Sequence, residues 1–311
     1  MHVTIASHYR LPVTGYGGTE RVVVALVRGL RALGHQVTLL AAPGTLVPDV
    51  TVVPVAPEVL TDPRLDLATL APRDSDILHA HFLLNRAPSR PYVQTLHGHL
   101  PKGASPPPLT IFVSRAHAAY YQRDAFVHNG LDPTDYEYRA TKGAYDLFLG
   151  RLHRVKGYRW AIEGARRAGR PLVIAGGWRP SLRGGVRFVG AVGGARKVEL
   201  LAGARCLWAP ALWEEPFGLT AIEGLFSGTP VLGTRRGALP EIVSPEVGAL
   251  GDSLDDLVTA RAEIETRTAA ACRAHAERNF THRAMAAGYL RMYADVLERD
   301  ALPAGRAATD A

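Results

Sequence analysis

Glu215 and Glu223 are two carboxylates with seven residues between them, and that segment opens with Pro-Phe-Gly. The apolar run 205–210 before them predicts a buried strand, and the helix formers of 219–227 predict a helix that a glycine and a proline end. A helix N-terminus offers unpaired backbone N–H groups and a positive dipole end, which suit a diphosphate. Carboxylates accept hydrogen bonds from vicinal hydroxyls. The pattern predicts a site for a ligand with both groups, although the spacing alone also fits a solvated helix.

Two cations follow another expected strand, in the segment Gly-Arg-Leu-His-Arg-Val-Lys-Gly that contains Arg151 and Lys156. A diphosphate leaving group gains negative charge in the transition state, so two cations here would help its departure more than its binding. The same segment could be a solvated turn. Beside the carboxylate motif we favour the functional interpretation.

A glycine-rich segment, 15–20, follows the first expected strand and opens a helix. Its residues Gly17 and Gly18 would let the backbone approach a ligand closely. The segment is not the Gly-x-Gly-x-x-Gly dinucleotide fingerprint, and 150–177 lacks that fingerprint too. The glycines therefore predict contact with a ligand, but no nicotinamide site.

His97 stands at the end of an expected strand, in Thr-Leu-His-Gly-His. Parallel sheets bind ligands at the carboxyl ends of their strands, which makes His97 a candidate site residue. A lone histidine is more often a packed residue, and we assign no role to His99. The proline-rich segment 100–108 after it is a candidate loop over an acceptor.

Two patterns suggest metal ligands, and we reject both. The segment Asp74-Ser75-Asp76 fits an Asp-x-Asp metal motif, but the apolar residues after it make Asp76 the polar start of a buried strand. His79 and His81 alternate along that strand without a carboxylate or thiol set to complete a site. We predict no catalytic metal and no cofactor.

Short apolar strands alternate with helical segments along the chain, which predicts parallel sheets covered by helices on both faces. Strands are expected at 3–7, 37–41, 51–55, 77–80, 92–96, 110–113, 146–149, 171–175, 186–189 and 205–210, and helices at 20–33, 160–168, 219–227 and 281–299. The fold class is therefore α/β, with two doubly wound, Rossmann-like units. Asp, Pro and Gly residues in 131–144 predict the boundary between them.

The stretch 215–231 resembles the signature of the retaining glycosyltransferases of family 4, the glycosyl transferases group 1 with the GT-B fold. Further similarities lie at His97, at the Arg151–Lys156 segment, and at 128–132, which is similar to the Asn-Gly-Val-Asp that closes the first domain in that family. The resemblance implies an acceptor domain at 1–138, completed by a helix at about 281–302. It also implies a nucleotide-sugar domain at 144–280, facing the first domain across a cleft. We expect 303–311 to be a disordered tail.

Roles follow from the resemblance residue by residue. It implies that Glu223 accepts from ribose hydroxyls, that Glu215 binds the donor sugar, and that Arg151 and Lys156 stabilise the leaving diphosphate. It also implies that His97 faces the transferred sugar. The remaining implied contacts are the backbone N–H groups of Phe217, Gly218 and Leu219 to phosphate and sugar, the loop of Gly17 and Gly18 against the donor, and the loop starting at Gly190 near the base.

Composition limits the partners. The 311 residues suit two domains, the mean hydropathy is near zero, and no apolar run approaches the roughly 20 residues of a membrane span. The net charge of +7 comes from 36 Lys+Arg against 29 Asp+Glu, dispersed along the chain, which argues against a nucleic-acid groove. Cys206 and Cys272 form no metal or disulfide pattern. We expect a cytoplasmic protein; peripheral contact with the inner membrane face and the oligomeric state stay open.

The resemblance thus implies a retaining hexosyltransferase that uses a nucleotide-diphosphate sugar as co-substrate and a hydroxyl-bearing acceptor, and we expect it to act without metal. It is similar in organisation to small bacterial enzymes that glycosylate natural products, glycolipids or polysaccharides, and UDP-, GDP-, ADP- and dTDP-sugars are all compatible donors. A non-catalytic nucleotide-sugar-binding protein and a nucleotide-sugar epimerase of the same fold are the alternatives. An epimerase is not expected to carry the signature, and a binding protein would lack catalytic positions that are present here.

Overall fold

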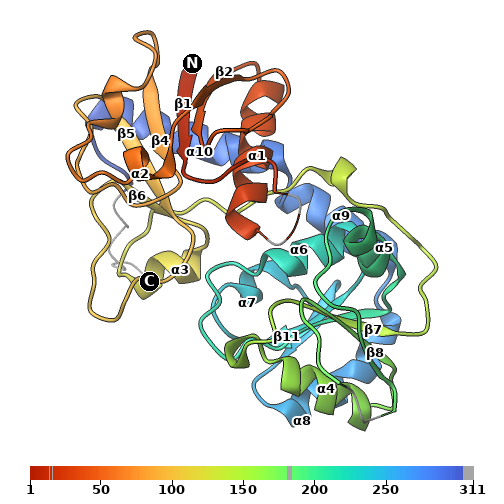
Figure 1. The fold of residues 1–311 in the computed structure, drawn as a ribbon. Helices are drawn as coiled ribbons and strands as arrows, with labels where there is room; N and C mark the ends of the chain where they lie inside the picture. Colours follow the sequence, from red (N-terminus) through yellow and green to blue (C-terminus); the bar gives the residue numbers. More distant parts are fainter. Residues whose placement is uncertain (14, 16, 181–183, 304–311) are drawn as a thin grey trace. The chain divides into compact units, whose positions relative to one another are not determined.

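The computed structural model describes residues 1–13, 15, 17–180 and 184–303, which form two compact units, each built on a six-stranded parallel sheet (Figure 1). Of these residues, the first unit comprises Met1–Val13, Gly17–Gly130 and 282–303, and the second comprises Gly15 and Leu131–Thr281. The α/β fold class with two doubly wound sheets is therefore confirmed. Tyr16 of the glycine-rich segment and residues 304–311 of the expected tail lie outside the described residues.

The sheet of the first unit has the order β3-β2-β1-β4-β5-β6. Its strands are β1 (His2–Ser7), β2 (Gln36–Ala41), β3 (Thr51–Pro54), β4 (Ile77–Ala80), β5 (Tyr92–Leu96) and β6 (Thr110–Phe112), and its helices are α1 (Gly18–Ala32), α2 (Pro57–Leu60), α3 (Arg115–Tyr120) and α10 (His282–Arg299). Because side chains alternate along a strand, Leu78 and Ala80 pack into an apolar cluster with Leu60 of α2. His79 points to the opposite face, where it contacts α10.

The sheet of the second unit has the order β12-β11-β10-β7-β8-β9. Its strands are β7 (Asp146–Leu149), β8 (Leu172–Ala175), β9 (Val186–Phe188), β10 (Cys206–Ala209), β11 (Val231–Thr234) and β12 (Gly248–Gly251); its helices are α4 (Tyr158–Arg167), α5 (Gly194–Gly203), α6 (Leu219–Phe226), α7 (Leu239–Ile242), α8 (Leu254–Glu263) and α9 (Ala269–Asn279).

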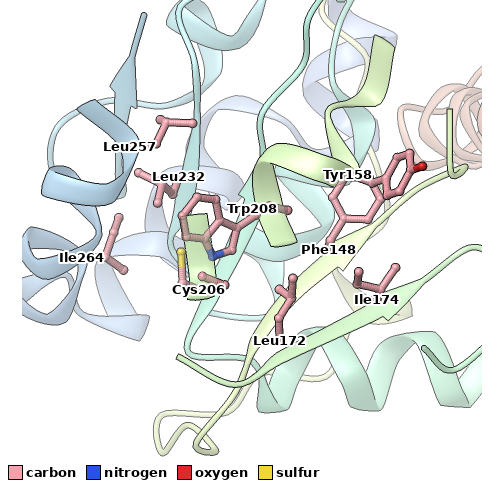
Figure 2. Packing of buried hydrophobic residues seen from close by; sticks show 11 residues of the cluster. Phe148, Tyr158, Leu172, Ile174, Cys206, Trp208, Leu232, Leu257 and Ile264 are labelled. Atoms are coloured by element: carbon pink, nitrogen blue, oxygen red, sulfur yellow. The ribbon is translucent and has the colours of Figure 1, made fainter. Parts of the chain in front are cut away.

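Trp208 is the largest side chain in the core of the second unit. It is 1% exposed and belongs to a cluster with Phe148, Leu232 and Leu257, so β7, β10 and β11 pack against α8 through it (Figure 2). On the other face of β10, Leu207 lies directly beneath Gly224 of α6. Burying apolar side chains on both faces fixes the strands whose ends carry the polar residues described next.

Every strand and helix expected from the sequence is present, with ends shifted by at most two residues. Within the described residues, no helix has both the length and the apolarity of a bilayer span.

Candidate functional site

In each sheet the first and fourth strands of the unit lie side by side, so the strand order reverses between β1 and β4 and again between β7 and β10. In such sheets ligands bind outside the carboxyl ends of the strands at the point of reversal. The sequence-predicted residues of the first unit follow β1 and β5, and those of the second unit include residues that follow β7 and β10. The topology thus gives each unit one candidate site.

Lys156 and Glu215 form the centre of the site in the second unit. Lys156 Nζ donates to Glu215 Oε2 at 2.7 Å, and the two side chains are 22% and 14% exposed. Trp213 Nε1 donates to the same oxygen at 2.7 Å, and Lys156 Nζ lies 4.9 Å from the centroid of the Trp213 ring. The structure therefore brings the two predicted charges into direct contact, and Trp213, which no sequence motif marks, contacts both.

The backbone around this pair depends on two glycines. Gly157 follows Lys156, has a φ of 71°, and lies so close to Pro210 that a Cβ would come within 1.8 Å of the Pro210 carbonyl oxygen. Gly237 has a φ of 57°, and its Cβ would meet the Glu215 backbone at 2.2 Å. Any larger residue at either position would displace the loop that carries the pair. Arg151, which follows β7, is exposed in the same loop as Lys156.

The N-terminus of α6 begins where the sequence predicts it. Gly218 has a φ of 94° and is the residue before the helix, and Phe217 is 3% exposed. Leu219 is the first helical residue. The backbone N–H groups of a first helical turn point out along the axis, which suits an anion.

Glu223 lies one turn into α6 and is 1% exposed. Its Oε1 accepts from Lys197 Nζ at 2.6 Å and from the Tyr136 hydroxyl at 3.0 Å. Lys197, on α5, is itself buried and keeps the carboxylate compensated in a low-dielectric setting. No sequence motif marks either partner, although Lys197 is one of only four lysines in the chain.

Gly190 follows β9, has a φ of 76°, and its carbonyl accepts from Gly176 N at 2.7 Å. Gly17 and Gly18 follow β1 in the first unit, where Gly18 begins α1. Gly17, Gly18 and His97 therefore belong to the first unit. Gly190 belongs to the second unit, together with the charged residues of the predicted site.

His97 follows β5 and is half-buried. Its Nε2 lies 2.9 Å from His81 Nδ1, and the two rings are stacked at 20°. Next to them, His79 lies 2.7 Å from the Tyr293 hydroxyl and 2.8 Å from Thr95 Oγ1. Burial lowers the pKa of His97 and of His79 to about 3, with smaller contributions from His117 and His97 respectively. Both rings are therefore neutral near pH 7.

The rejected metal patterns have other partners. Asp76 Oδ2 accepts from His2 N at 2.7 Å at the start of β1. The described residues contain no group of three or more His, Cys, Asp or Glu side chains arranged to hold a metal ion.

Two family profiles match the chain. Glycosyl transferases group 1 matches residues 145–273, and Glycosyltransferase Family 4 matches residues 16–132. An uncharacterized glycosyltransferase of Methanocaldococcus jannaschii is 29% identical over 154 residues, which are 40% of this chain and 39% of that protein. The MMP alpha-(1->4)-mannosyltransferase of Mycolicibacterium hassiacum is 49% identical over 47 residues, 15% and 11% of the two chains. The matches thus span well under two thirds of either relative.

Solved structures match along almost the whole chain. AviGT4, a glycosyltransferase involved in avilamycin A biosynthesis, is similar with a TM-score of 0.81 and 29% identity over 96% of this chain and 98% of that one. HepE of Anabaena, in complex with UDP and glucose, has a TM-score of 0.68 and 17% identity over 94% and 99%. At that identity, HepE shows the shared fold alone.

Proposed function

Since this chain belongs to glycosyltransferase family 4 and has the GT-B fold, we propose that it moves a hexosyl-type unit from a nucleotide-diphosphate sugar to a hydroxyl acceptor, with retention and without a metal ion. The observation that carries the proposal is the Lys156–Glu215 pair. It places a cation and a hydrogen-bond acceptor at 2.7 Å, at the carboxyl ends of the two strands between which the sheet order reverses.

The pair suits the two parts of the donor. Lys156, with Arg151 in the same loop, stabilises the diphosphate as its charge grows, and Glu215 accepts from hydroxyls of the sugar. The N–H groups at Phe217, Gly218 and Leu219 add donors that need no metal. A cation held by Glu215 before the donor binds is already oriented, which lowers the reorganisation that the reaction requires.

Glu223 is proposed to bind the ribose, with its charge compensated by Lys197. Its Oε1 accepts from Lys197 and Tyr136, and an ionised carboxylate is an acceptor with about four lone-pair sites in total, which suits a pair of ribose hydroxyls. The loop at Gly190 lies near the base, and the loop of Gly17 and Gly18 lies against the donor. His97 faces the transferred sugar.

Retention follows from front-face attack. The bond between the anomeric carbon and the phosphate oxygen breaks, the acceptor oxygen bonds to the same face, and the acceptor proton passes to the leaving phosphate oxygen. Glu215 is already held by Lys156 and Trp213, so it serves as a hydrogen-bond acceptor and not as a nucleophile.

The acceptor is proposed to be a natural product. AviGT4, which is involved in avilamycin A biosynthesis, matches this chain over 96% of its length at 29% identity. The test is product formation on hydroxylated natural-product acceptors compared with lipid and polysaccharide acceptors. Transfer only to the latter would overturn this choice and leave the transferase proposal intact.

The proposed activity is tested with UDP-, GDP-, ADP- and dTDP-sugars in a buffer that contains EDTA. We expect one nucleotide series to raise the melting temperature and to be hydrolysed slowly, and Lys156→Gln to lose both effects. Arg167→Met is the matched control, because Arg167 pairs with Asp255 at the far end of α4. Binding without release of diphosphate would support a binding protein, and recovery of an isomerised donor would support an epimerase.

A further inference from the structure

We propose that His81 is a positioning residue: it donates its Nδ1–H to Nε2 of His97, and so makes His97 present Nδ1–H as a hydrogen-bond donor to a hydroxyl of the transferred sugar. The direction of the bond between the two rings rests on the structure alone. The assignment of the sugar hydroxyl rests on the proposed function.

The register of the sheet brings the two rings together. His79 pairs with Val93 in the register of β4 and β5, and its side chain contacts Thr95, two residues further along β5. His81 contacts His97 with the same offset, two residues further along both segments. Because side chains two apart share a face, all four side chains lie on the side of the sheet that α10 covers. Each histidine is the residue directly after its strand, so the pairing of β4 with β5 brings the two rings together.

The contact between the rings holds one proton. The pKa values of His81 and His97 are both lowered by burial, so both rings are neutral and each carries a single N–H. Either His81 Nδ1–H donates to His97 Nε2, or His97 Nε2–H donates to His81 Nδ1. The two arrangements differ in which nitrogen of each ring carries the proton.

The other nitrogen of His81 decides between them. His81 is 3% exposed, and its Nε2 is buried without a hydrogen-bond partner in the part of the chain that the structure describes. This Nε2 has no partner among the described residues in either arrangement, so the choice is between a buried N–H and a buried lone pair left unpaired. If His97 were the donor, the proton of His81 would sit on Nε2 as an unpaired buried N–H, which is rarer in proteins than an unpaired buried acceptor. The proton of His81 therefore lies on Nδ1, and that of His97 lies on its own Nδ1.

Other buried side chains also restrict the His81 ring. The His79 ring lies 4.3 Å from the His81 ring, and His79 is fixed by Tyr293 and Thr95 at 2.7 and 2.8 Å. Thr95 in turn lies 3.0 Å from the Tyr289 hydroxyl. This buried row of neutral groups leaves the His81 ring little room to rotate, so it can hold His97 in one tautomer and one orientation.

The proton placement is tested in the free protein by nitrogen-15 NMR of labelled histidines, with the His97 signals identified by their loss in His97→Asn. We expect His97 to be protonated at Nδ1 and bare at Nε2. His81→Asp puts an acceptor where the donor was and should switch His97 to the Nε2–H form. His81→Asn keeps an N–H donor at the position of Nδ1 and should keep the wild-type signals. A wild-type His97 protonated at Nε2 would overturn the proposal.

The role is tested by donor turnover in the same variants. His81→Asp should lower kcat about tenfold with little change in KM, whereas His81→Asn should stay within about threefold of wild type, since one hydrogen bond is at stake. Normal kcat in a His81→Asp protein whose His97 has switched tautomer would refute the link to the sugar. If no nucleotide sugar is turned over by the wild type while the NMR result holds, the proposed function fails and the proton placement stands.

Discussion

The two units share one sheet topology and differ in the polar groups that it carries. In both, the first and fourth strands of the unit are neighbours. In the first unit a row of neutral groups, including His79, His81 and His97, lies beside them. In the second unit the corresponding place holds two ion pairs, Lys156–Glu215 and Lys197–Glu223.

This difference shows that the topology selects where a ligand can bind, whereas the side chains select its chemistry. Neutral imidazoles and hydroxyls can hydrogen-bond a sugar without adding charge. Ion pairs keep fixed charges in a partly desolvated place, where they act strongly on a diphosphate. A further buried ion pair, Asp146–Arg261, ties β7 to α8 in the second unit, so the reliance on charge there extends to stability.

The largest expected effect is the loss of stability when the Asp146–Arg261 pair is broken. Asp146 accepts from Arg261 Nε and Nη2, both at 2.7 Å, and also from Trp208 Nε1 at 2.8 Å, and both charged side chains are 1% exposed. Arg261→Met would leave a buried, uncompensated carboxylate, so we expect the free energy of unfolding to fall by about 3–5 kcal/mol. Urea unfolding followed by tryptophan fluorescence measures it, because all four tryptophans lie in the second unit.

The same measurement on Asp146→Asn combined with Arg261→Met should recover part of that loss, because the buried charge is then gone. A double variant less stable than Arg261→Met alone would contradict this explanation.

Catalysis gives the next largest effect. Lys156→Gln and Glu215→Gln each remove one charged partner of a 2.7 Å bond, and we expect each to lower kcat/KM roughly ten- to hundredfold, or about 1.5–3 kcal/mol. Because the two groups act together, the double variant should lose less than the product of the single losses. Steady-state kinetics measures this, and independent, multiplicative losses would show that the pair is not a unit.

Most of the fold could be predicted because its signals are local. Apolar strands such as 77–80 and 92–96 are short runs between polar or turn residues, and the structure has both with those bounds. The segments 194–203 and 231–279 gave no prediction. Helix α9, for example, has no continuous apolar stripe, and β12 has two glycines among its four residues.

The site could be predicted only where its residues are close in the sequence. The loop of Arg151 and Lys156 and the turn before α6 are such segments. The partners Lys197 and Tyr136 of Glu223 lie 26 and 87 residues from it, and nothing near either residue marks the contact. The sequence suggests His81 only as a metal ligand, because its contact with His97 depends on strand register, which one sequence does not display.

The neutral histidines should make the first unit sensitive to acid. The pKa of His79 is about 3 in the folded protein and about 6.5 when unfolded, so below pH 6.5 the unfolded chain binds a proton that the folded chain does not. Stability is therefore complete above that pH and is lost progressively as pH falls from 6.5 toward 3. From about pH 6.5 to about pH 5.5, His79 alone should remove about 1 kcal/mol. Hydrogen exchange of β4 and β5, corrected for intrinsic rates, measures it, and an equal slope in His79→Gln would contradict the assignment.

The smallest effect concerns an exposed ion pair of the second unit, and it shows whether burial or charge pairing distinguishes the units. Arg167 on α4 pairs with Asp255 on α8 at 2.6 Å, a distance no longer than that of the buried pair on the same helix, but the side chains are 37% and 79% exposed. Water already solvates both charges, so Arg167→Met leaves no buried carboxylate without a partner. We expect the free energy of unfolding to change by at most about 0.5 kcal/mol. Urea unfolding by tryptophan fluorescence compares it directly with Arg261→Met. Equal losses in the two variants would mean that charge pairing itself stabilises this unit, and the contrast with the neutral first unit would then be one of charge and not of desolvation.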